Sequence, residues 1–151
     1  MLCFLVASLG LALALPGFDQ GRVKVDGAEI AYQIRRGTGP AVVLVPGSYV
    51  GADDWTEVVA SLDRTLTIQI VELRGHGQSW PPPAAGSIPQ FAGDVFAAAE
   101  HAGLKRFYAG GHSIGGMIAI EMAAQRPASI RGVISVEGWT CLLYTSPSPR
   151  D

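Results

Sequence analysis

The chain has 151 residues, a formal net charge of −2 and 48% apolar residues, enough to bury the core of one globular domain. Only 16% of the residues are charged and no basic run occurs, which excludes intrinsic disorder and gives no support to a nucleic-acid partner. The sequence shows no metal-ligand spacing and no phosphate-binding glycine loop. We therefore expect no metal and no cofactor.

Residues 2–15 form an almost unbroken apolar run, too short for a typical membrane span and of the right length for a signal peptide. Residues 12–14, Ala-Leu-Ala, fit a cleavage site, but no basic residue precedes Arg22. An uncleaved anchor, a buried N-terminal helix and a misplaced start codon therefore stay open. We expect residues 1–14 to be a signal peptide and the protein to be secreted or periplasmic, with no stable membrane span after cleavage. Without a signal the protein would be cytoplasmic.

Residues 141–151, Cys-Leu-Leu-Tyr-Thr-Ser-Pro-Ser-Pro-Arg-Asp, have none of the periodicity of the preceding sequence. They match the translation of a transposase-type sequencing-library adapter, and the codon of Thr140 would place the junction in register. We therefore expect a non-native tail at 141–151, and we expect residues 15–140 to be the N-terminal part of one folded domain. A natural Ser/Pro-rich tail is the alternative.

Six short segments carry the apolar or alternating pattern of strands. An Asp-Gly pair at 26–27 predicts a hairpin between the segments 22–25 and 29–34. The segment 41–45 is uniformly apolar and mostly β-branched, which is typical of a strand that is covered on both faces in a parallel sheet. The predicted strands are 22–25, 29–34, 41–45, 66–72, 106–110 and 130–136.

Three helices are predicted between these strands. Asp53 or Asp54 is expected to cap a helix through residues 55–62, Ser87 to begin the second, and residues 116–124 to form the third. The alternation of strands and helices predicts an α/β fold with a doubly wound, mostly parallel sheet and an N-terminal hairpin. Three acidic residues are assigned to exposed helix surfaces: Asp94, Glu100 and Glu121.

The most informative motif is Gly-His-Ser-Ile-Gly at residues 111–115, between a buried strand and a helix. A G-x-S-x-G sequence at a strand-to-helix turn is the pattern of a nucleophile elbow. Glycines permit the sharp turn, and the helix N-terminus favours negative charge beside the serine. Such a motif also arises by chance in a glycine-rich chain, so its context carries the prediction.

Four features occur in the order typical of one family: the hairpin, the apolar strand ending in Pro46-Gly47, the Arg-Gly-His-Gly-Gln-Ser turn at 74–79, and the motif at 111–115. In these features residues 22–140 resemble the N-terminal half of the α/β-hydrolase superfamily, truncated at the C-terminus. The resemblance implies that Ser113 is a nucleophile that forms an acyl-enzyme. It also implies an oxyanion hole made by the backbone N–H groups of Ile114 and Ser48. For Ser48, an ordinary loop serine is the alternative.

The resemblance further implies a triad in the chain order serine, acid, histidine, and no histidine follows Ser113. We expect His76 to be structural in its tight turn, His101 to be solvated on a helix, and His112 to point away from the nucleophile's pocket. The triad acid is either Glu137 or a residue beyond position 140.

Together these patterns predict the N-terminal part of a serine hydrolase that cleaves an ester, amide or related bond in a small-molecule substrate. The chain as given is expected to be inactive, because the triad histidine is missing. Two other functional hypotheses also fit the sequence. One is the same fold with other chemistry, such as a cofactor-free haloperoxidase or a carbon–carbon bond hydrolase. The other is a non-catalytic binding protein.

Overall fold

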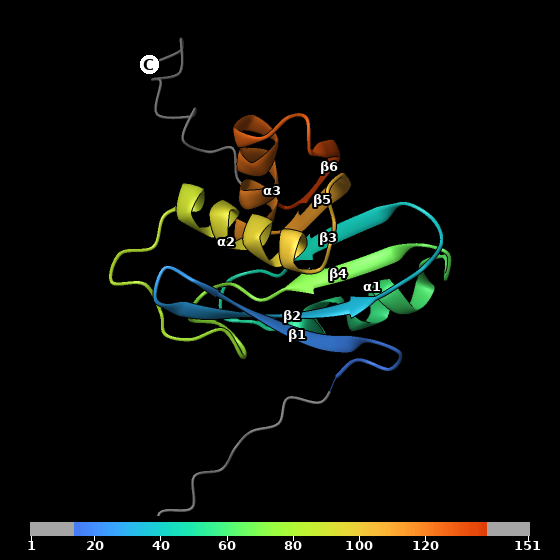
Figure 1. Ribbon diagram of the computed structural model, residues 1–151, viewed down its shortest axis with the longest axis horizontal. Coiled ribbons are helices and arrows are strands. Elements are labelled where there is room, and N and C mark those ends of the chain that lie inside the picture. The colour runs from blue at the N-terminus through green and yellow to red at the C-terminus, as the bar shows by residue number, and fades with distance from the viewer. Residues whose placement is uncertain (1–13, 139–151) are drawn as a thin grey trace, which may run out of the picture.

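The computed structural model describes residues 14–138, which form a six-stranded sheet with helices on both faces (Figure 1). All but the last residue of the predicted signal peptide, and the whole predicted tail, lie outside the described residues. The strand order is β1-β2-β4-β3-β5-β6. The strands are β1 (Asp19–Val25), β2 (Ala28–Arg35), β3 (Ala41–Val45), β4 (Thr67–Val71), β5 (Phe107–His112) and β6 (Ile130–Val136).

The sheet is mixed, as predicted. Strands β4, β3, β5 and β6 are parallel to one another. Strands β1 and β2 form an antiparallel hairpin, and β2 also pairs antiparallel with β4. At the hairpin turn, Asp26 and Gly27 have φ values of 42° and 77°. A two-residue turn with both φ values positive matches the twist of the strands it joins, which is why Asp-Gly is favoured there. The predicted fold class and hairpin are confirmed.

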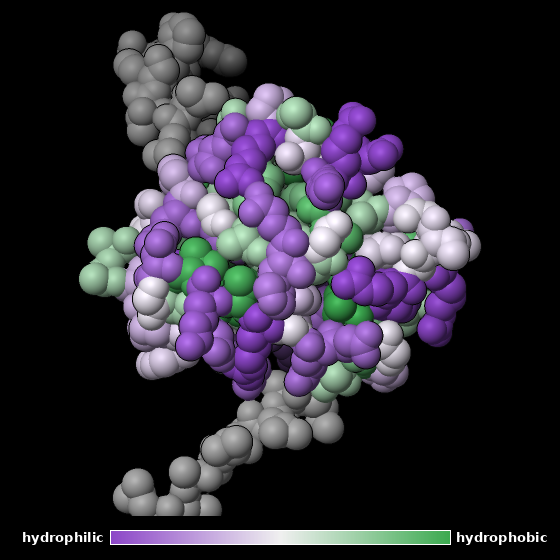
Figure 2. All heavy atoms as spheres, viewed as in Figure 1, coloured by the Kyte–Doolittle hydropathy of each residue, from purple (hydrophilic) through white to green (hydrophobic). Residues whose placement is uncertain are grey.

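The helices are α1 (Thr56–Ser61), α2 (Ile88–His101) and α3 (Ile114–Gln125). Helices α2 and α3 lie together on one face of the sheet and α1 lies on the other (Figure 1). The α2–α3 face buries the larger core cluster, which includes Phe96, Phe107 and Ile118. The smaller cluster contains Trp55 and lies under α1. Figure 2 shows that hydrophilic side chains cover most of the visible surface, with small apolar patches between them.

The face of the sheet that carries α1 is less fully covered than the face that carries α2 and α3. A hollow of about 510 Å³ lies between α1 and β6, lined mainly by apolar side chains from α1, β3 and β6. Within it, Ile134 and Val136 of β6 are exposed. Strand β6 is also the edge of the described sheet, so these side chains lie beside unpaired backbone.

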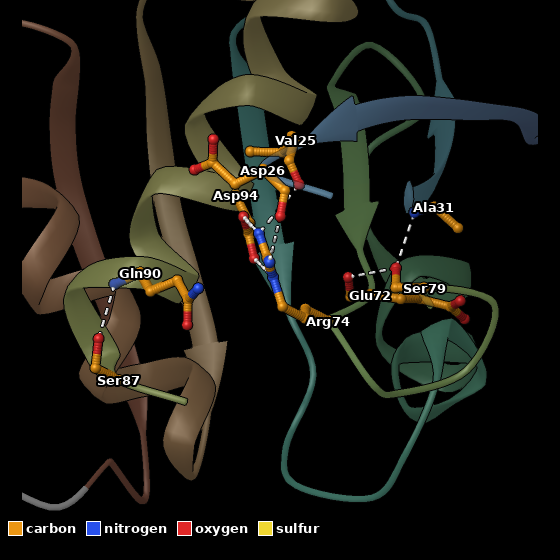
Figure 3. Close-up of polar contacts among 9 residues, drawn as sticks. All are labelled: Val25, Asp26, Ala31, Glu72, Arg74, Ser79, Ser87, Gln90 and Asp94. Atoms are coloured by element: carbon orange, nitrogen blue, oxygen red, sulfur yellow. Dashed lines mark hydrogen bonds and ion pairs between the residues drawn. The ribbon is translucent and has the colours of Figure 1, made fainter. Parts of the chain in front are cut away.

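The start of α1 differs from the prediction. Neither Asp53 nor Asp54 accepts a side-chain cap bond; a 3₁₀ turn at Ala52–Trp55 leads into the helix instead. In this turn the Thr56 hydroxyl donates to the Asp53 carbonyl at 2.7 Å. In this tight turn neither aspartate side chain lies over the free N–H groups of the helix; Asp54 faces His112 instead. The predicted start of α2 at Ser87 is confirmed: Ser87 is the N-cap residue, and its Oγ accepts from the Gln90 N–H at 3.3 Å (Figure 3).

Asp94 was predicted on a helix surface, and this prediction is wrong. Its side chain is only 3% exposed and forms a two-pronged ion pair with Arg74, at 2.6 and 2.9 Å (Figure 3). The guanidinium also donates to the carbonyls of Val25 and Asp26, so it joins the hairpin, the 74–79 turn and α2. The hydrogen bonds that Arg74 donates to the Asp94 carboxylate raise the pKa of Arg74 above its usual value. The spacing of residues along the helix does not indicate that Arg74 would be buried against Asp94.

Glu100 and Glu121 remain at helix surfaces. Glu100 pairs with Arg126, and Glu121 accepts from the Gln125 side chain at 2.9 Å. Across residues 14–138 no helix is long and apolar enough to cross a membrane.

Candidate active site

Strand β5 ends at His112 and α3 begins at Ile114, so Ser113 is the single residue between them. Ser113 has φ 54° and ψ −121°, a conformation that costs a residue with a side chain about 1–3 kcal/mol and that clusters at functional sites. Backbone hydrogen bonds hold it there: its N–H donates to the Val136 carbonyl at 2.9 Å, and its carbonyl accepts from the N–H groups of Gly116 at 2.9 Å and Met117 at 3.4 Å. The serine is therefore fixed by main-chain contacts from both sides.

The two glycines of the motif are required by close approach of the backbone. A Cβ atom on Gly111 would lie 2.1 Å from the carbonyl of Gly115. A Cβ on Gly115 would lie 2.2 Å from the Val45 carbonyl oxygen at the end of β3. Real Cβ atoms do not approach other atoms so closely, so any larger residue would force the turn open. We call residues 111–115 the elbow.

The loop that follows β3, residues 46–51, comes close to the elbow. A Cβ on Gly47 would lie 3.6 Å from Ser113 Cβ and 3.1 Å from His112 Nδ1, so this backbone borders the serine. Ser48 is exposed just beyond this point, and Ile114 is the first residue of α3, where helical N–H groups have no acceptor within the helix. The structure thus brings Ser113, Ile114 and the loop of Ser48 to one edge of the sheet. Their catalytic roles stay predictions.

His112 lies beside this site, between two carboxylates. Its Nδ1 is 3.4 Å from Asp54 Oδ2 and its Nε2 is 3.7 Å from Glu137 Oε2. Its ring also lines the hollow on the α1 face. Glu137 directly follows β6, with φ 49° and a side chain that is 83% exposed. The structure places this candidate acid next to His112.

The other two histidines have partners of their own. His76 Nδ1 is 3.2 Å from the Arg74 carbonyl, within its own turn. His101 is exposed at the end of α2, as predicted, and its Nδ1 also lies 2.8 Å from the Tyr32 hydroxyl of β2. Between residues 14 and 138, no hydrogen bond or ion pair joins a histidine to Ser113.

Sequence reasoning missed Glu72, which follows β4. It is only 4% exposed, and its carboxylate accepts from the backbone N–H groups of Ala52 at 2.9 Å and Gln78 at 2.6 Å. An acidic residue directly after a wholly buried strand was the available signal. The described residues contain no cluster of three His, Cys, Asp or Glu side chains placed to hold a metal ion.

A strained serine between a parallel strand and a helix, at the carboxyl edge of a mixed sheet, is an arrangement found in α/β hydrolases. The sequence model described as the alpha/beta hydrolase fold matches residues 40–150. The chain therefore belongs to the α/β-hydrolase family.

Three proteins that are similar to this chain carry names with different activities. The chain is 33% identical over 112 residues to a Klebsiella pneumoniae protein named as a carbamate hydrolase, RutD, covering 74% of this chain and 41% of that protein. It is 30% identical over 112 residues to the dihydrolipoyllysine-residue acetyltransferase component of an acetoin-cleaving system from Cupriavidus necator, covering 74% and 30%. The structure of a bacterial membrane phospholipase A aligns with a TM-score of 0.75 and 28% identity, covering 83% and 41%. The chain thus spans less than half the length of these proteins.

Proposed function

We propose that this chain is the N-terminal part of a serine hydrolase in which Ser113 attacks a carbonyl carbon of a small-molecule substrate. The observation that carries the proposal is the strained position of Ser113 between β5 and α3, held by backbone contacts on both sides. Strain of this kind persists only where the surrounding structure imposes it, and it is typical of functional groups. Attack would release the leaving group and form an acyl-enzyme, which water would then hydrolyse.

The charge that develops on the carbonyl oxygen needs donors already in place. The N–H of Ile114, at the start of α3, and the N–H of Ser48, in the loop next to the elbow, are the two proposed donors. Each donor of this kind contributes about 3–4 kcal/mol to stabilisation of the transition state. The positive end of the α3 dipole would add to the same effect.

The general base of this reaction is not among the three histidines of the chain. His76 and His101 are bonded elsewhere, and His112 faces Asp54 and Glu137. We therefore place the base, and either Glu137 or a later residue as its acid, in a full-length protein of the size of its relatives. The 151-residue chain alone should show negligible turnover.

The names of the three similar proteins favour carbonyl substrates. They refer to a carbamate, to a phospholipid and to an acetyl group, and each of these reactions is an attack on an acyl carbon. We therefore propose an ester, amide or carbamate as the bond cleaved, and a panel of such compounds would identify which one.

The test is to compare variants of the full-length protein recovered from the source gene on that panel. Ser113→Ala should lower kcat by on the order of 10³-fold or more, because the nucleophile is gone. Ser87→Ala, which removes only the α2 cap, is the matched control and should stay within about twofold. Hydrolysis that survives in Ser113→Ala would contradict the proposal.

A further inference from the structure

Glu72 is a buried carboxylate at the carboxyl end of β4, beside the proposed site but outside it. None of the ion pairs within residues 14–138 involves it. Burying a carboxylate without a cation is unfavourable unless hydrogen bonds compensate for the lost water. The compensating donors here are backbone N–H groups of two separate segments, so the carboxylate joins those segments.

The first segment is the loop 46–51, which carries Ser48. Its far end is held where the Ala52 N–H donates to Glu72 Oε1 at 2.9 Å. A Cβ on Gly51 would lie 2.9 Å from that same oxygen, so the backbone of the loop rests directly on the carboxylate. Between Gly47 and Gly51 the loop is exposed, and Tyr49 has a φ of 64°. The bond to Glu72 is therefore the main polar anchor at the end of the loop away from β3.

The second segment is the turn 74–79. The Gln78 N–H donates to Glu72 Oε2 at 2.6 Å, and a Cβ on Gly77 would lie 2.4 Å from that oxygen. The ring of Tyr49 also lies 5.8 Å from the ring of His76, which is a second contact between loop and turn. The turn itself is fixed to the sheet by Ser79, whose hydroxyl donates to the Glu72 carbonyl and accepts from the Ala31 N–H (Figure 3).

We propose that Glu72 is a positioning residue for catalysis: it ties the loop 46–51 to the turn 74–79 and so fixes the Ser48 N–H where the oxyanion forms. This inference rests on the proposed function of Ser113 and Ser48. Glu72 touches neither substrate nor nucleophile and acts only through the loop. Oxyanion donors act in the transition state, so a misplaced donor lowers kcat and leaves KM unchanged.

The variant that tests this role is Glu72→Gln in the full-length protein. A glutamine side chain keeps the shape but offers one acceptor oxygen, so either the Ala52 or the Gln78 N–H would face an amide donor. The expected result is a fall in kcat of roughly 10²-fold at unchanged KM, with the concentration of folded enzyme fixed by near-UV circular dichroism. Glu121→Gln is the matched control, because it makes the same substitution on α3, where, among the described residues, the carboxylate accepts only from the Gln125 side chain, and it should keep kcat within about twofold.

Hydrogen exchange of the peptide covering residues 46–52 provides a readout that needs no turnover. Glu72→Gln should speed exchange in this peptide, and Glu121→Gln should not. Unchanged exchange in Glu72→Gln would overturn the proposal, as would faster exchange with wild-type kcat. Full activity in Ser113→Ala would instead refute the proposed function, while the exchange result would still decide whether Glu72 holds the loop.

Discussion

The two segments proposed to form the oxyanion hole are held in place in different ways. The elbow is fixed by its own backbone: Gly111 and Gly115 allow contacts that no side chain would permit, and Ser113 is bonded to the end of β6. The loop 46–51 is largely exposed, and a buried carboxylate of β4 holds its far end to the turn 74–79. The comparison shows that a local motif can position one half of a site while distant side chains position the other.

The largest effect on stability is expected at the buried Arg74–Asp94 ion pair, which holds the turn 74–79. Arg74→Met would leave Asp94 buried without its partner and should lower the free energy of unfolding by about 3–5 kcal/mol. Arg22→Met is the control, because the Arg22–Glu29 pair is nearly half exposed and contributes about 0–1 kcal/mol. Chemical denaturation of both variants measures the difference. Equal losses would show that the turn does not depend on its buried pair.

Adding a single methyl group at a glycine of the elbow should lower the stability of the protein. Gly115→Ala places a carbon 2.2 Å from the Val45 carbonyl oxygen and should destabilise the protein by about 3 kcal/mol. In α2, a Cβ on Gly93 would meet nothing within 4 Å, so Gly93→Ala should stabilise the protein by about 0.5–1 kcal/mol. Thermal unfolding of the two variants gives opposite shifts if backbone contact is what fixes the elbow. A tolerated Gly115→Ala would contradict that explanation.

These contrasts explain how much the sequence could predict. The strand 41–45 and the elbow were found because their signals are local: a β-branched run, and glycines at fixed spacing before a helix. The Arg74–Asp94 pair joins residues twenty positions apart. Asp94 lies on the buried face of α2, three residues after Phe91 and four before Ala98, but the sequence does not indicate which cation pairs with it. Likewise, no pattern around Glu72 indicates that two loops will place their N–H groups on it. The expected Asp53 or Asp54 cap failed because a 3₁₀ turn replaced the first turn of α1.

The smallest expected effect is a gain in stability at the proposed nucleophile. Ser113→Gly should raise the free energy of unfolding by about 1 kcal/mol, because glycine adopts a φ of 54° without strain. Ser113→Ala also removes the hydroxyl but keeps a Cβ in the same conformation, so it should give no such gain. Denaturation curves of the two variants separate strain from chemistry. No difference between them would show that the serine is not strained.

The most direct test of the central claim is covalent labelling of the full-length hydrolase with an alkyl fluorophosphonate, followed by peptide mapping. An activated serine should form one phosphonate adduct on Ser113, in step with loss of hydrolysis, and Ser113→Ala should not be labelled. An active preparation that stays unlabelled at Ser113, or that carries the label on another residue while activity is lost, would contradict the assignment of Ser113 as the nucleophile.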